Sequence, residues 1–264
     1  MRVSRIIEYK PQVIGVDDYP TCLQNGLLTC KNYKIVIAGL IRDAEKRLPH
    51  LKYLIWSLGR LFKDFQVVFY ENDSKDDTVA QLDQWEKTKC ISEQLRVPSF
   101  GSVFTLKRME FMVQCRNRYL EYIDNNIQDI DYVIVLDTDI NDISINGVAS
   151  SFGIPGWNCI TSQGLDTVND VIIYYDIAPL VIDGLIRNAT ALLPIPMVVL
   201  KVESAFGGLA IYKYSDIRGK RYHTGVMAGD KCDWHPDMRP MCDHIGLNLQ
   251  LDNVLINPYQ IVIR

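Results

Sequence analysis

The sequence contains no apolar run long enough to cross a membrane, which takes roughly 20 consecutive residues. The best candidate, LLPIPMVVL at 192–200, is short and is broken by two prolines. The beginning of the chain, MRVSRIIEYKPQVIG, lacks the long apolar core of a secretory signal. These absences predict a soluble, cytoplasmic protein without a membrane span.

Clustered positive charge is absent as well. Lys and Arg number 28 against 32 Asp and Glu, which gives a net charge of −4 and a pI near 5.6. The sequence shows no Lys/Arg cluster with interleaved aromatic residues, so the basic footprint of a nucleic-acid-binding protein is missing. We therefore expect no nucleic-acid partner.

The cysteines lack the even count and regular spacing of a disulfide framework. Seven are scattered along the chain, which favours reduced, mostly buried thiols in a cytosolic setting. One group does resemble a metal site, because Cys232, His235, Cys242 and His244 form C-x2-H-x6-C-x-H. Thiolate and imidazole sets hold structural zinc, but this spacing fits no common zinc finger, so zinc is a minor alternative here.

What the sequence does contain is an alternation of apolar strands and amphipathic helices. The expected elements are strands at 34–41, 66–72, 93–100 and 132–140, and helices over about 43–62, from the DSKDDT segment to about 89, and 107–125. Continuous apolar strands are typical of a parallel sheet that is buried on both faces. Such an order predicts parallel pairing with right-handed crossovers.

The two ends of the chain show a weaker pattern. After about residue 142 the sequence becomes a mixture of short apolar pieces with Gly, Pro and Asn. Residues 1–31 are expected to form an irregular or β-hairpin extension packed on the sheet. Because 264 residues suit one large α/β domain and no linker is visible, we predict a single domain over 1–264.

Two carboxylates directly follow the apolar segment YVIVL. Side chains two residues apart on an extended segment point the same way, so Asp137 and Asp139 can converge on one object. Burying two like charges is unfavourable unless a cation compensates. Mg²⁺ or Mn²⁺ binds a few carboxylates together with phosphate oxygens, and a diphosphate would complete its shell. A solvated turn in which Asp139 caps the next segment is the alternative for a bare DxD.

Polar side chains also end the other predicted strands, at the sheet edge where open α/β folds bind ligands. Arg42 follows the first strand, and Glu71 and Asn72 end the second, where they suit hydrogen bonds to a base or ribose. Arg116 and Arg118 lie on the helix before the DTD, and a guanidinium suits a diphosphate or a base edge. Surface ion pairs are the alternative for these arginines.

Two further carboxylates stand near these strand ends. For Asp43 and Asp73 we favour a role as helix caps, because short acidic side chains accept hydrogen bonds from the first backbone N–H groups of a helix. Both precede segments with a helical pattern. They are therefore not included among the predicted ligand-binding residues.

Taken in order, the segments IAGLIRDAEKRLPHL, FYENDSKDDT, RNRYL, YVIVLDTDI, ESAFGGLAIYK and CDHIGLN resemble a GT-A-fold glycosyltransferase. More narrowly, they resemble the fungal capsule-associated mannosyltransferase group and related glycosyltransferases of bacteria and large DNA viruses, including those that decorate chlorella-virus capsids. The resemblance covers about residues 34–258. It implies a Rossmann-like α/β fold with a mostly parallel central sheet, flanking helices and an irregular C-terminal half on the acceptor side.

The resemblance implies a nucleoside-diphosphate-sugar donor held by Mn²⁺ or Mg²⁺, and a saccharide or glycoprotein glycan as acceptor. It places Asp137 near the ribose or donor sugar and Asp139 on the metal, with His244 as the third metal ligand. Glu71 matches the family position that faces the nucleoside. The metal and positive side chains would neutralise the leaving diphosphate.

On the acceptor side, VESAFGGLAIYK (202–213) and YYD (174–176) resemble segments of the same family. Glu203 is a candidate acceptor-binding or basic carboxylate. Asp243 precedes His244 where the family usually carries Glu, and it would be the general base of an inverting reaction. A helix N-terminus capped by Asp243 is the alternative. Tyr174 or Tyr175 suits stacking on a sugar or packing in the core.

Donor and outcome differ among the relatives that the sequence resembles. The fungal group implies GDP-mannose with retention, whereas some viral members imply UDP-xylose with inversion, and the acidic residue before His244 favours inversion. A viral source would place the chain in the host cytoplasm. Two other functions stay open: a nucleotidyltransferase, although AGLIRDAEKR is not the Gly-rich basic loop it needs, and a non-catalytic nucleotide- or carbohydrate-binding module.

Overall fold

The computed structural model of the chain describes residues 12–13, 15, 18–97, 104–168, 171–176, 178–186, 198–229 and 238–264. Its helices are α1 (Tyr19–Cys30), α2 (Leu48–Gly59), α3 (Thr78–Asp83), α4 (Leu106–Asn126), α5 (Ile145–Ser151), α6 (Tyr214–Ile217) and α7 (Asp243–Asn248). Its strands are β1 (Gln12–Val13), β2 (Lys34–Ile41), β3 (Asp64–Asn72), β4 (Thr88–Glu93), β5 (Tyr132–Leu136), β6 (Asp142–Ile143), β7 (Cys159–Val168), β8 (Val171–Tyr174), β9 (Val181–Ile182), β10 (Leu185–Ile186), β11 (Leu200–Val202), β12 (Leu209–Lys213), β13 (Val226–Ala228), β14 (Met238–Pro240) and β15 (Val254–Ile263).

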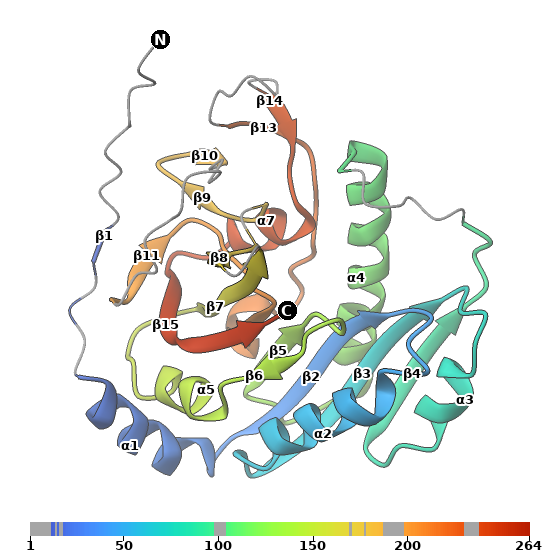
Figure 1. The fold of residues 1–264 in the computed structure, drawn as a ribbon, viewed down its shortest axis with the longest axis horizontal. Helices are drawn as coiled ribbons and strands as arrows, with labels where there is room; N and C mark the ends of the chain where they lie inside the picture. Colours follow the sequence, from blue (N-terminus) through green and yellow to red (C-terminus); the bar gives the residue numbers. More distant parts are fainter. Residues whose placement is uncertain are drawn as a thin grey trace.

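A large curled sheet organises the molecule (Figure 1). Within the described residues its strands follow the order β1-β11-β15-β7-β12-β5-β2-β3-β4, with β6 on β15 and β8 on β7. The run β5-β2-β3-β4 is parallel throughout, as the alternation of strands and helices predicts. Beyond it, β12 pairs antiparallel with both β5 and β7, whereas β7 and β15 are parallel. The protein therefore has the expected mixed α/β architecture.

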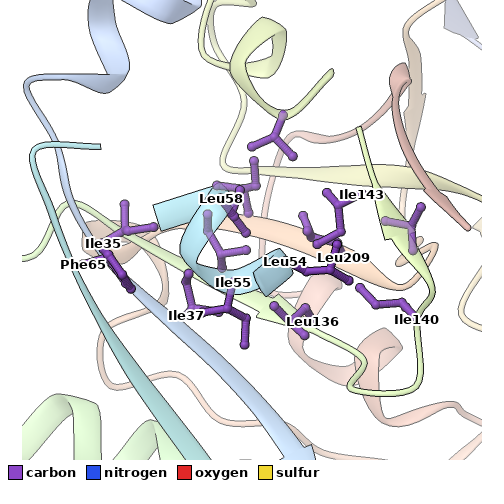
Figure 2. Close-up of a cluster of buried hydrophobic side chains, with 14 of the residues drawn as sticks. Ile35, Ile37, Leu54, Ile55, Leu58, Phe65, Leu136, Ile140, Ile143 and Leu209 are labelled. Carbon is purple, nitrogen blue, oxygen red and sulfur yellow. The ribbon is translucent and has the colours of Figure 1, made fainter. Parts of the chain in front are cut away.

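The apolar strand β2 sends its side chains to two separate layers. Ile35 and Ile37 pack with α2 residues such as Leu54, and Figure 2 shows this cluster around the α2 helix. Val36 and Ala38 point to the other face, where they pack with residues of α4. Both faces of the parallel strands are thus covered, and this explains why their sequence is continuously apolar. Polar side chains are left to the strand ends.

Several predicted boundaries are wrong by a few residues. The helix expected over 43–62 is shorter, and Pro49 lies in its first turn, where proline is tolerated. The helix expected to reach residue 89 ends at Asp83, and Lys87 then has φ 59, which an α-helix does not accept. Of the strand expected at 93–100, Glu93 is the last residue of β4, 94–97 are not in a strand, and 98–100 lie outside the described residues. The segment 132–140 is extended only as far as the end of β5.

Residues 19–30 form the helix α1 rather than part of a β-hairpin, and the short strand β1 before them pairs with β11. Asp18 caps α1 by accepting a hydrogen bond from the Thr21 backbone N–H (3.0 Å), and this cap was not recognised in the sequence. Gly26 brings α1 against α5, since a Cβ there would lie 1.8 Å from the Ala149 carbonyl oxygen. The expectation of an irregular or hairpin extension is therefore wrong for residues 19–30.

The C-terminal half contains long strands of the central sheet instead of irregular chain alone. β7 and β15 each run for 10 residues, and their neighbourhood buries polar side chains that bind one another. The Asn257 amide donates to Ser150 (3.0 Å) and Ser151 (2.8 Å), and the Gln260 amide donates to Ser162 (2.9 Å).

None of the described helices combines the length and apolarity that a bilayer span requires.

Candidate functional site

The two carboxylates of the DTD segment extend from the carboxyl end of β5. The backbone N–H of Asp137 donates to the Gly208 carbonyl oxygen (2.9 Å), and the Thr138 hydroxyl donates to the Leu40 carbonyl oxygen of β2 (2.8 Å). Thr138 thus ties the segment to the sheet. The side chains of Asp137 and Asp139 remain 33% and 47% exposed, so they are available to a ligand.

Arg116 is buried on α4 and faces carboxylates from two other elements. Its Nε donates to Asp243 of α7, and its Nη2 lies 3.8 Å from the Asp137 carboxylate. Its guanidinium also lies 5.8 Å from the Phe206 ring centroid and 5.7 Å from that of Tyr222. Burial alone would lower the pKa of Arg116, but Asp243, together with Tyr119, Tyr222 and Asp137, outweighs the effect of burial and raises that pKa. Arg116, a permanent cation, therefore links the DTD segment after β5 to α7.

The two carboxylates beside Arg116 differ in basicity. Burial alone would raise the pKa of Asp243, but the adjacent Arg116 guanidinium holds it well below the usual range. The partial burial of Asp137 raises its pKa above the usual range, with Arg116 opposing from farther away and Asp176 and Asp139 adding to the increase. Asp243 is consequently an ionised partner of Arg116 and a weak proton acceptor.

His244 lies next to Asp243 at the start of α7 and is almost fully buried. Its ring stacks on Phe206, with centroids 3.6 Å apart and an interplanar angle of 15°, and meets the edge of Tyr222 at 5.8 Å. Within the part of the chain that the structure describes, neither ring nitrogen has a hydrogen-bond partner. Burial, together with the Arg116 charge, lowers the pKa of His244 to about 3, so the ring is neutral near pH 7.

A further carboxylate, Asp176, lies beside this cluster and was not among the predicted site residues. Its Oδ2 accepts a hydrogen bond from the Gly207 backbone N–H (2.8 Å). Gly207 and Gly208 have φ values of 65° and 82°, a conformation that suits glycine. Burial raises the pKa of Asp176 to about 6, although the Gly207 N–H opposes the increase. The sequence signal for Asp176 is its place at the end of the YYD segment just after β8, where the two tyrosines are the more obvious candidates for a sugar contact.

Asp139 pairs with an arginine that the sequence did not point to. Nη2 of Arg264, the residue that follows β15, lies 2.9 Å from the Asp139 carboxylate. The same guanidinium lies 5.7 Å from the Tyr175 ring centroid. No sequence pattern connects residues 139 and 264, because their contact depends on how β15 pairs with β6 and β7.

The donor set is only partly suited to a divalent cation. The carboxylates of Asp137 and Asp139 are close enough for one to raise the pKa of the other, and such oxygens suit Mn²⁺ or Mg²⁺. Among the described residues, however, no group of three His, Cys, Asp or Glu side chains is arranged to hold a metal. The predicted third ligand, His244, is packed between Phe206 and Tyr222 instead. A cation held here would take its remaining ligands from phosphate and water.

The ends of β2 and β3 place the other predicted donor residues at the same sheet edge. Glu71 is fully buried, and its two oxygens accept hydrogen bonds from the Ser74 backbone N–H and the Ser92 hydroxyl, each at 2.6 Å. Asn72 is 8% exposed. Arg42 lies 3.6 Å from the Asp43 carboxylate, which is the surface ion pair considered as its alternative. Glu71 thus fixes the loop after β3.

The expected capping roles of Asp43 and Asp73 are wrong. The Asp43 carboxylate accepts a hydrogen bond from the Lys75 backbone N–H (2.7 Å), which connects two loops. Asp73 accepts from the backbone N–H groups of Arg96 (2.8 Å) and Val97 (3.1 Å), beyond β4. Both side chains therefore brace loops at the sheet edge, and neither begins a helix.

Arg118 lies on a different face of α4 from Arg116. Its side chain is 53% exposed, and it pairs with Glu93 (3.3 Å) and Glu121 (3.7 Å). These three residues line a groove of about 310 Å³ together with Tyr70. The structure therefore brings Arg116 to the DTD carboxylates but leaves Arg118 outside that cluster.

The last predicted residues have other partners or are not described. The Glu203 carboxylate accepts a hydrogen bond from the Gly184 backbone N–H (2.9 Å) in the turn between β9 and β10. Cys232 and His235, which the alternative zinc site requires, lie outside the described residues. Cys242 is buried, and its thiol donates to Asp243 (3.1 Å).

No protein-family model matches the chain, and no curated protein does. Solved structures do match it. The mannosyltransferase PcManGT from Pyrobaculum calidifontis, in complex with GDP-Man and Mn²⁺, has a TM-score of 0.50 and 10% identity over 93% of this chain and 65% of that one. TarS from S. aureus, in complex with UDP-GlcNAc, has a TM-score of 0.49 and 12% identity over 88% of this chain. The chain spans 58% of that TarS chain.

At these identities the likeness concerns the fold. The TM-score of 0.50 with the mannosyltransferase shows a shared architecture, which is the GT-A fold that the sequence resemblance implies. Structural neighbours of the chain are therefore glycosyltransferases of GT-A type.

Proposed function

We propose that the chain is a metal-dependent glycosyltransferase that moves a sugar from a nucleoside diphosphate to a glycan hydroxyl. The observation that carries this proposal is the pair Asp137 and Asp139 at the carboxyl edge of parallel strands, where open α/β sheets bind ligands. Each carboxylate faces an arginine, Arg116 or Arg264. Carboxylates for a metal and guanidinium groups for a diphosphate are the chemistry that a nucleotide sugar requires.

On this proposal Asp137 and Asp139 would hold Mn²⁺ or Mg²⁺, which when bound neutralises charge on the leaving diphosphate. Arg116 is fixed by Asp243 and adds a second positive charge beside them. Arg42 and Asn72 would contact the nucleoside. Both oxygens of Glu71 already bind the protein, so Glu71 would shape the nucleoside pocket through the loop after β3.

For an inverting reaction the favoured proton acceptor is Asp176, and not Asp243 or Glu203. The ion pair with Arg116 makes Asp243 a weak base, and Glu203 binds the turn at Gly184. The pKa of Asp176, raised to about 6 by burial, is close to that of an efficient general base at neutral pH. Asp176→Asn is expected to reduce turnover by roughly 10²–10⁴-fold at unchanged donor affinity. A loss of less than about 10-fold in Asp176→Asn would show that Asp176 is not the base.

The donor and acceptor are proposed only as classes. The fold shared with a protein solved with GDP-Man and Mn²⁺ supports a nucleotide sugar. UDP-xylose and GDP-mannose are the two donors that the sequence resemblance suggests, so both pentosyl and hexosyl transfer belong to the proposal. The acceptor would be a glycoprotein, capsule or capsid glycan, made in the cytoplasm of the producing or host cell.

The test is release of nucleoside diphosphate from a panel of UDP- and GDP-sugars with Mn²⁺. Asp139→Ala is expected to abolish the release, and EDTA to do the same in the wild type. Asp142→Ala is the matched control, because Asp142 is an exposed carboxylate of the next strand, β6. Binding of donors without turnover would favour a non-catalytic module, and pyrophosphate release from a nucleoside triphosphate would favour a nucleotidyltransferase.

A further inference from the structure

The backbone of Arg264 is fixed beside the loop that carries the DTD carboxylates. Its N–H donates to the Leu165 carbonyl oxygen of β7 (3.0 Å). The carbonyl oxygen of the preceding Ile263 accepts a hydrogen bond from the Asn141 N–H (2.7 Å), two residues after Asp139. Strand pairing therefore holds Arg264 at a defined place relative to Asp139.

With the described residues, the Arg264 side chain makes one ion pair, which leaves further N–H donors available. Its Nη2 lies 2.9 Å from the Asp139 carboxylate, and both side chains are about half exposed, at 52% and 47%. An exposed pair of this kind contributes little to stability. A guanidinium has five N–H donors in a planar fork, so several remain for a second anion.

Tyr175 lies against the Arg264 side chain. Its ring lies under the Arg264 guanidinium at 5.7 Å, and its buried hydroxyl has no hydrogen-bond partner among the described residues. A Cβ added to Gly208 would lie 2.2 Å from that hydroxyl, and the Gly208 carbonyl oxygen binds the Asp137 N–H. The aromatic ring, the unpartnered hydroxyl and the guanidinium thus lie together next to the DTD segment.

We propose that Arg264 is a diphosphate-binding residue that exchanges partners during donor binding. Without a donor it neutralises Asp139; when a divalent cation takes Asp139, the guanidinium turns to the donor's diphosphate. This inference rests on the proposed function and assigns a residue that the sequence resemblance does not. Metal and diphosphate then bind cooperatively, because each favours the state in which Arg264 has left Asp139.

The test is calorimetric titration of the purified chain with Mn²⁺ alone and with UDP or GDP in the presence of Mn²⁺. In Arg264→Ala, Mn²⁺ alone is expected to bind about two- to five-fold tighter, since an exposed ion pair no longer competes for Asp139. UDP or GDP is expected to bind about 10- to 100-fold more weakly, since a charge-assisted hydrogen bond to phosphate is lost.

Arg60→Ala is the matched control, because Arg60 is an exposed arginine that follows α2, and it should change neither affinity. Arg264→Lys keeps the charge without the planar fork, so it should bind Mn²⁺ as the wild type does and the nucleotide with intermediate affinity. This variant also serves as the test if Arg264→Ala melts below the assay temperature.

Three outcomes would overturn the inference. Weaker Mn²⁺ binding in Arg264→Ala would show that Arg264 supports the metal instead of competing with it. Unchanged nucleotide affinity in Arg264→Ala, with the affinity lost in Asp139→Ala, would remove Arg264 from the site while the proposed function stands. Failure of the wild type to bind either nucleotide would contradict both.

Discussion

The run β5-β2-β3-β4 is the parallel half of the sheet, and the strands from β12 to β11 are its mixed half. The two halves bury different kinds of side chain. In the parallel half the interior of β2 is entirely apolar, and polar groups such as Glu71 and Asp137 occur at strand ends. In the mixed half, Ser162, Asn257 and Gln260 are fully buried and bind other polar side chains. The elements of the parallel half can therefore be predicted from local sequence, whereas the roles of the polar residues in the mixed half depend on contacts between distant positions.

Arg116 connects the two halves, and its removal should have the largest effect. Arg116→Ala leaves Asp243 buried without its cation, which is expected to cost about 3–5 kcal/mol of unfolding free energy. Arg118→Ala, on another face of the same helix, should cost at most about 1 kcal/mol because its pairs are exposed. Urea unfolding of both variants measures the difference. Equal losses would show that the buried ion pair between Arg116 and Asp243 contributes no more to stability than the exposed pairs of Arg118.

Gly207, in the mixed half of the sheet, lies directly against the backbone of β7. A Cβ there would lie 2.0 Å from the Ser162 carbonyl oxygen, at a φ of 65°. Strain and overpacking together predict a loss of about 2–4 kcal/mol for Gly207→Ala. Gly156 has a φ of 82° but open space around it, so Gly156→Ala should lose only about 1–2 kcal/mol. Similar thermal midpoints for the two variants would contradict the close approach of Gly207 to the Ser162 carbonyl oxygen.

A buried amide can be compared directly with a buried aliphatic side chain. The Asn248 amide donates to Ser204 (3.0 Å) and to the Ala205 carbonyl oxygen (2.8 Å), and it accepts from Tyr212 (3.0 Å). Asn248→Leu leaves these groups unpaired, at a cost of about 1–3 kcal/mol. Ile37→Val in the parallel half should cost about 0.5–1.5 kcal/mol. A neutral Asn248→Leu in chemical unfolding would show that the polar network of the mixed half is dispensable.

The pH dependence of stability should report on the burial of His244. The pKa of His244 is lowered by burial from 6.5 to about 3, so below pH 6.5 the unfolded chain takes up a proton that the folded chain refuses. Stability is therefore lost as pH falls from about 6.5 toward 3, with a slope of up to about 1.4 kcal/mol per pH unit.

His244→Phe keeps a ring against Phe206 and removes this titration. Denaturant midpoints at pH 6.5 and 4.5 should thus differ less in the variant than in the wild type. The difference between the two proteins isolates His244, because the other titrating groups are common to both. An identical pH dependence in the two proteins would mean that the folded chain protonates His244 as readily as the unfolded chain does.

Much of the parallel half could be predicted from the sequence. The strand at 34–41 and the helix at 107–125 are recognisable because continuous apolar runs and 3.6-residue periodicity are local signals. Asp137 and Asp139 were recognisable for the same reason, since they directly end an apolar strand. The same logic could not separate Arg116 from Arg118, because two positions on one helix differ only by the face that the fold covers.

The mixed half could not be predicted in the same way. Strands with buried Ser, Asn and Gln do not alternate cleanly between apolar and polar residues, and so they resemble loops. Asp176 acquires its environment from the Gly207 N–H, and Arg264 reaches Asp139 only through the pairing of β15. Contacts between positions 31 to 125 residues apart leave no local pattern.

A crystal structure with UDP or GDP and Mn²⁺ tests the central claim most directly. The account predicts an anomalous manganese signal at the Asp137 and Asp139 carboxylates, with the diphosphate between Arg116 and Arg264. A nucleotide in the groove lined by Glu93 and Arg118, or manganese bound away from the DTD segment, would contradict the account.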